Sequence, residues 1–288
     1  MNKFTRSLAL AKASWAVLLA EREMLGYTAL SAVLTAIAIA ALAIPGILLM
    51  LAQQGAERAG GSSTSPMGIV LLFIFYLVIS FITLFFNTAL IGAALQRLRG
   101  EDTNFSQGMQ VAINNIGNIF VFALISATVG VVLAVIEEKF QVVGQIVGGI
   151  LGGAWGIVTF LVIPVMVAEG TSPFAAIKRS AQLLRKTWGE QIIGSGGIGF
   201  VLFLLSFFGL LPIVLAALAD SVAALVAGVV IAVIYWAILF LVGSALSGIF
   251  RAAVYLYAQT GETPSQFDAG LLREAFRQKS GAQRSGNI

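Results

Sequence analysis

Six long apolar runs alternate along the chain with short clusters of charged residues. The runs contain no Asp, Glu, Lys or Arg and cover residues 24–56, 59–96, 103–136, 141–168, 191–219 and 221–250. Each is longer than the ~20 residues that a helix needs to cross ~30 Å of hydrocarbon. Because a backbone in lipid must satisfy its own hydrogen bonds, such runs predict helices. We therefore expect an all-α, polytopic membrane bundle, one domain over residues 1–288, with six transmembrane helices at about 25–52, 67–95, 116–136, 143–168, 191–213 and 225–257.

Four shorter segments, between and beside these runs, have the pattern of helices with one apolar face. The clearest follows the fourth run, where the apolar residues repeat at helical spacing: Phe174, Ile177, Ala181, Leu184 and Trp188. The opposite face is polar and mostly basic: Lys178, Arg179, Gln182, Arg185 and Lys186. A helix with this pattern lies in the plane of the membrane interface. We expect amphipathic interfacial helices at about 4–22, 104–115, 173–188 and 264–279.

The connections after the second, fourth and sixth runs resemble one another. Each ends a membrane helix at a glycine (Gly100, Gly170 and Gly261), then offers a Ser, Thr or Asn and an early Phe. Glycine past a helix end, followed by an N-cap residue, marks where one helix stops and the next begins. The pattern indicates three helical hairpins in a weak internal threefold repeat. A generic alternation of hairpins and interfacial helices is the alternative.

The distribution of charge predicts the orientation of the bundle. Of the 17 Lys and Arg residues, only Arg58 and Lys139 fall on one side of the predicted membrane, and the other fifteen fall on the opposite side. Short loops rich in Lys and Arg stay cytoplasmic. We expect a bacterial inner-membrane protein with both termini and all four interfacial helices on the cytoplasmic side. The net charge of +4 then follows topology and does not indicate a nucleic-acid partner.

The composition argues against an enzyme. Cysteine and histidine are both absent, which removes thiol nucleophiles, thiolate metal sites and imidazole bases. The chain also lacks the HExxH, GxSxG and Walker patterns. We therefore expect no catalytic residues, no metal and no cofactor.

One polar cluster is a candidate site within the bilayer. Arg251 lies ten residues before Gly261, up to ~12–15 Å inside that end of its helix. Ionisable residues in this position are functional candidates. Glu169 is the expected counter-charge and Asn87 a neutral partner, so the three would line a vestibule facing the cytoplasm. The alternative is an Arg251 that snorkels to the headgroups.

A ladder of glycines marks one face of the fourth predicted helix: Gly144, Gly148, Gly152 and Gly156. Four-residue spacing places them on one side of the helix, where a neighbouring backbone can approach closely. We expect internal helix packing, with Ser195 and Gly199 or Ser244 and Gly248 as partner faces. An oligomer seam or a sliding surface is the alternative.

Several short stretches also resemble a known family. They are Asn87-Thr88-Ala89-Leu90, Arg97-Leu98-Arg99-Gly100-Glu101, Ser126-Ala127-Thr128-Val129-Gly130, Gly153-Ala154-Trp155, Pro164-Val165, Glu169-Gly170, Arg179-Ser180, Thr187-Trp188-Gly189, Tyr255-x-Tyr257-Ala258 and Thr260-Gly261. The chain thereby resembles an uncharacterised family of bacterial six-helix membrane proteins. More distantly it resembles the membrane domain attached to some glycerophosphodiester phosphodiesterases, without their catalytic barrel. The resemblance implies the six-helix topology and no reaction.

Together these patterns favour a non-enzymatic membrane scaffold or lipid-associated factor. Its partners would be membrane phospholipids, with a second copy of the chain or another membrane protein as a further possibility. Lys178, Arg179, Arg185 and Lys186 are the candidate headgroup contacts. The alternative function is a transporter or channel built on the vestibule of Asn87, Glu169 and Arg251.

Overall fold

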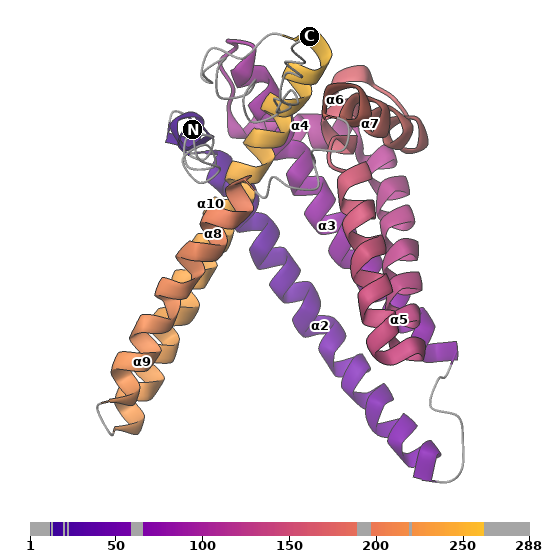
Figure 1. Ribbon diagram of the computed structural model, residues 1–288, viewed down its shortest axis with the longest axis vertical. Coiled ribbons are helices and arrows are strands. Elements are labelled where there is room, and N and C mark those ends of the chain that lie inside the picture. Colours follow the sequence, from indigo (N-terminus) through magenta and orange to yellow (C-terminus); the bar gives the residue numbers. More distant parts are fainter. Residues whose placement is uncertain are drawn as a thin grey trace, which may run out of the picture.

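The computed structural model describes residues 12, 14–19, 21, 23–58, 66–188, 197–218 and 221–261 (Figure 1). Within these residues all regular structure is helical, which confirms the all-α prediction. The helices are α2 (Met24–Arg58), α3 (Pro66–Leu98), α4 (Phe105–Asn114), α5 (Ile116–Val158), α6 (Val162–Glu169), α7 (Pro173–Trp188), α8 (Gly197–Ser206), α9 (Leu211–Ala217) and α10 (Val222–Thr260), with a 3-10 turn, η2 (Phe207–Leu210), between α8 and α9.

Five helical segments are long and apolar enough to cross a membrane. They are Met24–Leu48, Met67–Leu98, Ile116–Phe140, Val143–Glu169 and Val222–Thr260. The chain is therefore a multi-pass helical membrane protein by length and composition. The helix expected at 191–213 begins outside the described residues. From Gly197 onward it is interrupted by η2, and α9 has Pro212 in its first turn, where the missing N–H of proline needs no partner.

The residues assigned to α5 form a hairpin of two arms. The first arm, and the second arm together with α6, are each long and apolar enough to cross a membrane. Figure 1 shows its chain reversing direction at the end far from α6. At this reversal a side chain on Gly144 would collide with the carbonyl oxygen of Ile136, and one on Gly148 would collide with Glu137. Residues seven or more positions apart touch only if the helix turns back on itself. The third and fourth predicted helices therefore form a tight pair, as the sequence indicates.

The three repeated glycines end their helices in the left-handed conformation. Their φ angles are +88° at Gly100, +62° at Gly170 and +74° at Gly261. Residues with a Cβ rarely adopt this region, whereas glycine does so without steric cost. Each glycine therefore stops a long helix and redirects the chain. In Figure 1 the segments that follow the first two, α4 and α7, lie at one end of the bundle, here called the connector end.

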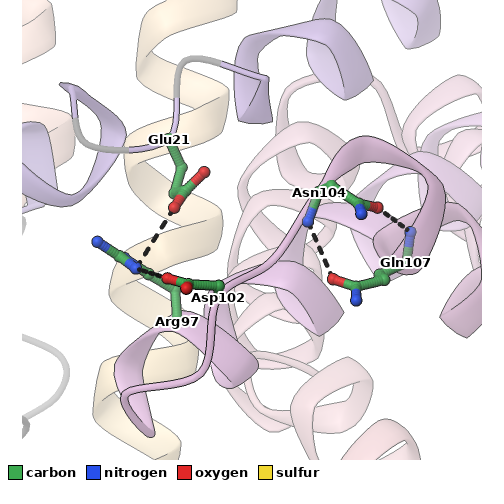
Figure 2. Close-up of polar contacts among 5 residues, drawn as sticks. All are labelled: Glu21, Arg97, Asp102, Asn104 and Gln107. Atoms are coloured by element: carbon green, nitrogen blue, oxygen red, sulfur yellow. Dashed lines mark hydrogen bonds and ion pairs between the residues drawn. The ribbon is translucent and has the colours of Figure 1, made fainter.

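The first connection is built from polar contacts that the sequence encodes locally (Figure 2). Asn104 caps α4, accepting a hydrogen bond from the backbone N–H of Gln107 at 2.9 Å. The side chain of Gln107 in turn accepts one from the N–H of Asn104 at 3.0 Å, completing a capping box. Arg97 lies 2.9 Å from Asp102 and 3.5 Å from Glu21, so it ties the connection to the segment before α2.

Helix α2 also holds the start of α4. The hydroxyl of Tyr27 donates to the carbonyl of Phe105 at 2.9 Å, and the two rings stack with centroids 4.6 Å apart. Gly108 leaves room for the Tyr27 hydroxyl, which a side chain at that position would displace. The capped helix α4 is therefore docked on the membrane bundle.

The core lies toward the connector end, where α3 packs against α2, α5 and α10. Leu90, Ile91 and Ile249 are almost fully buried there. At the opposite end α2 and the α8–α10 pair diverge (Figure 1), and large apolar side chains are exposed, such as Leu218 at 77% and Val222 at 82%. Exposed apolar residues on long helices are typical of surfaces that face hydrocarbon.

Candidate functional site

A groove runs along one face of α10 and ends at Arg251. The cavity has a volume of about 530 Å³ and lies between α10, α8 and α3. Its lining residues on α10 recur every three or four positions: Trp236, Leu239, Phe240, Gly243, Ser244, Ser247, Gly248 and Arg251. The remaining lining residues are Leu202, Phe203 and Ser206 of α8 and Asn87 of α3. We call this cavity the α10 groove.

Two glycines bring the neighbouring helices close enough to form the walls. A side chain on Gly243 would collide with Leu202 of α8, and one on Gly248 would collide with Leu90 of α3. Small residues at helix crossings allow this close approach in membranes. The α10 groove therefore lies beside two tight helix contacts, and Ser244 and Ser247 of α10 are among its lining residues.

Arg251 is the charged residue of the groove. It lies nine residues before the end of α10, about 14 Å along the helix axis. Its Nε atom is buried and has no hydrogen-bond partner among the described residues. The Cζ atom lies 5.3 Å from the ring centroid of Phe160, within range of a cation–π contact. In the described part of the chain no carboxylate forms an ion pair with Arg251.

Asn87 lies in the same groove as Arg251, as the sequence analysis proposed for this pair. Its side chain is half-buried and makes no hydrogen bond to any described residue. Polar side chains within a membrane segment usually pair with one another or face a cavity. The groove therefore collects Arg251 and Asn87, and also Ser244, as polar side chains that make no hydrogen bond to the described residues.

Glu169 lies outside the groove and serves a different connection. One of its carboxylate oxygens accepts a hydrogen bond from Arg179 Nε at 3.2 Å and another from the hydroxyl of Tyr255, also at 3.2 Å. Helix α10 is thereby tied to the junction of α6 and α7. The expected triad of Asn87, Glu169 and Arg251 is thus two separate sites. Tyr255 and Arg251 are four residues apart on α10, so helical periodicity places them on the same side of the helix. It does not tell which of the two contacts Glu169.

The helix is interrupted between α5 and α6. The side chain of Ser180 on α7 forms hydrogen bonds with backbone groups at this interruption. Pro164 lacks an N–H to donate to the carbonyl four residues earlier, which weakens the helix at this point. The hydroxyl of Ser180 donates to the carbonyl of Val158 at 2.6 Å and accepts from the N–H of Leu161 at 3.2 Å. This interruption places Phe160 against Arg251. The position of Pro164 in the sequence is enough to predict that the carbonyl of Phe160, four residues earlier, loses its helical partner. The contact with Ser180 could not be predicted from the sequence.

Helix α7 presents its basic residues away from the protein. It packs on α5 and α6 through Ala176, Ser180 and Leu183, which are buried. Three of its four candidate headgroup contacts are exposed: Lys178, Arg185 and Lys186. The fourth, Arg179, is held by Glu169. The packed face is rotated from the expected apolar stripe, because Phe174 is 68% exposed. The apolar pattern of a helix does not distinguish residues that face protein from residues that face lipid.

The glycine ladder faces the other arm of the α5 hairpin at its turn. Gly144 and Gly148 abut Ile136 and Glu137, as described above, and a Cβ on Gly152 would lie 3.7 Å from Leu133, an ordinary contact. A Cβ on Gly156 would meet no atom within 4 Å. The two arms therefore diverge along the ladder. Of the expected partner faces, Ser195 lies outside the described residues, and Ser244 and Gly248 face the α10 groove instead.

No metal site is evident in the described ranges, because their acidic residues nowhere gather in groups of three or more. The residues that could hold a ligand are instead the cation and amide of the α10 groove. Such a site can bind an anionic group by charge and hydrogen bonding.

Comparison with known proteins gives one family match. The model described as "Family of unknown function (DUF6159)" matches residues 66–265, which is well over half of the chain. The chain has no significant match among curated proteins and none among solved structures. The distant likeness to the membrane domain of glycerophosphodiester phosphodiesterases has no counterpart in these comparisons.

Proposed function

The chain belongs to this family of unknown function, whose description supplies no activity, and we propose from its chemistry that it is a non-enzymatic membrane scaffold associated with anionic lipid. One observation carries the proposal: α7 is fixed to the bundle by one face and exposes Lys178, Arg185 and Lys186 on the other. Each Lys or Arg near an anionic leaflet contributes ~1 kcal/mol of binding.

The position of α7 supports a role at the headgroups. The helix lies at the connector end, beside the end of the membrane-crossing segment Val143–Glu169 (Figure 1). Phe174 projects from the protein at its first turn, next to the basic residues. An apolar ring beside exposed cations is the arrangement of helices that lie in the interface. We propose the same interfacial role for α4 and for the segments 4–22 and 264–279, which lie largely or wholly outside the described residues.

The proposal includes a sixth crossing and an orientation. The segment from 191 through α9 would cross the membrane beside α10, which it contacts along α8, η2 and α9. An even number of crossings places both termini on one side. The excess of Lys and Arg at the connector end argues that this side is the cytoplasm of a bacterial inner membrane.

A transporter or channel is the second candidate function. The observation that favours it is the α10 groove, which reaches from Arg251 toward the middle of the membrane segment. Against it, the deep part of the groove is lined by Trp236, Leu239 and Phe240, with no charged residue beyond Arg251. Transport pathways for polar solutes usually carry polar or ionisable residues at this depth.

Lipid titration of the full-length protein in detergent tests the scaffold proposal. Phosphatidylglycerol or phosphatidylcholine with the same acyl chains is added at low salt, and the rise in melting temperature reports binding. Changing Lys178, Arg185 and Lys186 together to Gln should weaken the low-salt preference for phosphatidylglycerol by roughly a hundredfold, from ~1 kcal/mol per charge. Arg179 is left intact because it holds Glu169.

The matched control is Lys139→Gln, which removes an exposed charge at the turn of the α5 hairpin, far from α7. This variant should keep the preference of the unmodified protein. If the triple variant also keeps it, the basic face of α7 does not bind headgroups and the proposal fails.

A further inference from the structure

We infer that the α10 groove binds one anionic phospholipid, with the phosphate at Arg251 and an acyl chain along α10 toward Trp236. The inference concerns a site inside the membrane-spanning region and does not rest on the basic face of α7. It assigns a ligand to polar side chains of the groove that have no hydrogen-bond partner among the described residues: Arg251, Asn87 and Ser244.

Arg251 has the chemistry of a phosphate-binding side chain. Within the described residues its Nε has no hydrogen-bond partner, and Phe160 covers one face of the guanidinium. A guanidinium presents its N–H groups in a planar fork that fits two oxygens of a phosphate. Since an uncompensated charge among apolar helices is costly, an anion in the groove would stabilise the folded protein.

The α10 groove is long, and its two ends differ in polarity. Trp236 and Arg251 are fifteen residues apart on one helix, so the lining of α10 extends about 22 Å along its axis. One leaflet of the hydrocarbon core is about 15 Å thick, which is the reach of a lipid chain. Polar residues gather near Arg251, and Leu239, Phe240 and Phe203 line the deeper part. This gradient matches a phospholipid, with its charged head and apolar tail.

The polar groups of the deep wall already have hydrogen-bond partners, so they offer nothing to a polar solute. The indole N–H of Trp236 donates to the backbone carbonyl of Ser206 at 3.0 Å. The Ser206 hydroxyl donates to the backbone carbonyl of Phe203 at 2.6 Å. The hydroxyl of Ser247 donates to the carbonyl of Gly243 at 2.8 Å, within α10. The unused hydrogen-bonding capacity therefore lies at Arg251 and Asn87, and at the Ser244 hydroxyl midway along the α10 lining. A small anion would fill the Arg251 end alone and leave the apolar length of the groove without an occupant.

Lipid titration at high salt tests the inference. In 1 M salt the Debye length is about 3 Å, so contacts at exposed charges such as those on α7 are screened, whereas a buried ion pair is much less affected. The unmodified protein should still gain thermal stability from phosphatidylglycerol under these conditions, and gain less from phosphatidylcholine or inorganic phosphate. Arg251→Gln should weaken the apparent affinity for phosphatidylglycerol at least about tenfold, the value of a lost charge-assisted hydrogen bond.

Two further variants make the result specific to the groove. Ser244→Phe fills the groove without removing its cation, and should abolish the high-salt gain. The Lys178, Arg185 and Lys186 triple variant should retain it, even if it has lost the low-salt preference. The two proposals can therefore fail separately.

Fluorescence provides a readout that does not depend on the folding of Arg251→Gln. In a variant that keeps Trp236 and has Phe at the other three tryptophans, phosphatidylglycerol brominated on its acyl chain should quench the indole. Ser244→Phe should remove the quenching. An unquenched Trp236 overturns the inference, as does a high-salt gain that inorganic phosphate reproduces or that Ser244→Phe retains.

Discussion

Replacing Ser180 with alanine removes a single oxygen atom that joins α7 to the interruption between α5 and α6. That oxygen donates to the Val158 carbonyl at 2.6 Å and accepts from the Leu161 N–H at 3.2 Å, and Ser180 is fully buried. The change leaves almost no cavity, so the loss comes from two buried backbone groups. Leaving one such group unsatisfied costs about 1–3 kcal/mol. We expect Ser180→Ala to lower the free energy of unfolding by at least about 2 kcal/mol.

Equilibrium unfolding of the purified protein in mixed micelles, with increasing sodium dodecyl sulphate, measures this difference. Ser247→Ala is the matched control because it deletes the same atom. The Ser247 hydroxyl donates to Gly243 within α10, where the carbonyl keeps its ordinary helical partner four residues on. The control should therefore lose less than about 1 kcal/mol, as is usual for one net hydrogen bond. Equal losses in the two variants would refute the role assigned to Ser180.

Three other expectations follow from the fold. Gly144→Leu should clearly lower the melting temperature in detergent because its Cβ would meet the backbone carbonyl oxygen of Ile136, whereas Gly156→Leu, which has open space, should not; similar melting would show that the α5 arms are not in contact. Gly170→Ala should cost about 1–2 kcal/mol in the same unfolding assay, since φ is +62° there, and an unchanged stability would mean that α6 does not end in this conformation. Reporter fusions at Ser62 and after Ile288 should report opposite sides of the membrane, and the same side for both would contradict six crossings.

The positions of most helices along the chain could be predicted because they depend on local signals in the sequence. Five of the six apolar runs correspond to helical segments long enough to cross a membrane, and the positive φ angles of Gly100, Gly170 and Gly261 agree with helix ends anticipated from residue type alone. Asn104 with Gln107 is likewise a capping pair readable over four residues. These features need no knowledge of which helices are neighbours.

The pairing of side chains across helices could not be predicted in the same way. Arg251 and Tyr255 are four residues apart on α10, and a small difference in helix rotation decides which one meets Glu169. The role of Ser180 depends on α7 crossing the interruption at one position. The outward direction of Phe174 depends on the side of α7 that packs against protein, which an apolar stripe does not reveal.

The contact made by Ser180 also has a consequence for biogenesis. The backbone groups that it satisfies precede it by 19 and 22 residues, so they are synthesised first and remain without this partner. At about 5–20 residues per second, the ribosome needs roughly 1–4 s to add those residues. During this interval the two arms of α5 can already pack through Gly144 and Gly148, but the junction leading to α6 stays open. We therefore expect the nascent protein to hold a packed α5 hairpin, with the junction between α5 and α6 still lacking its partner, until α7 emerges.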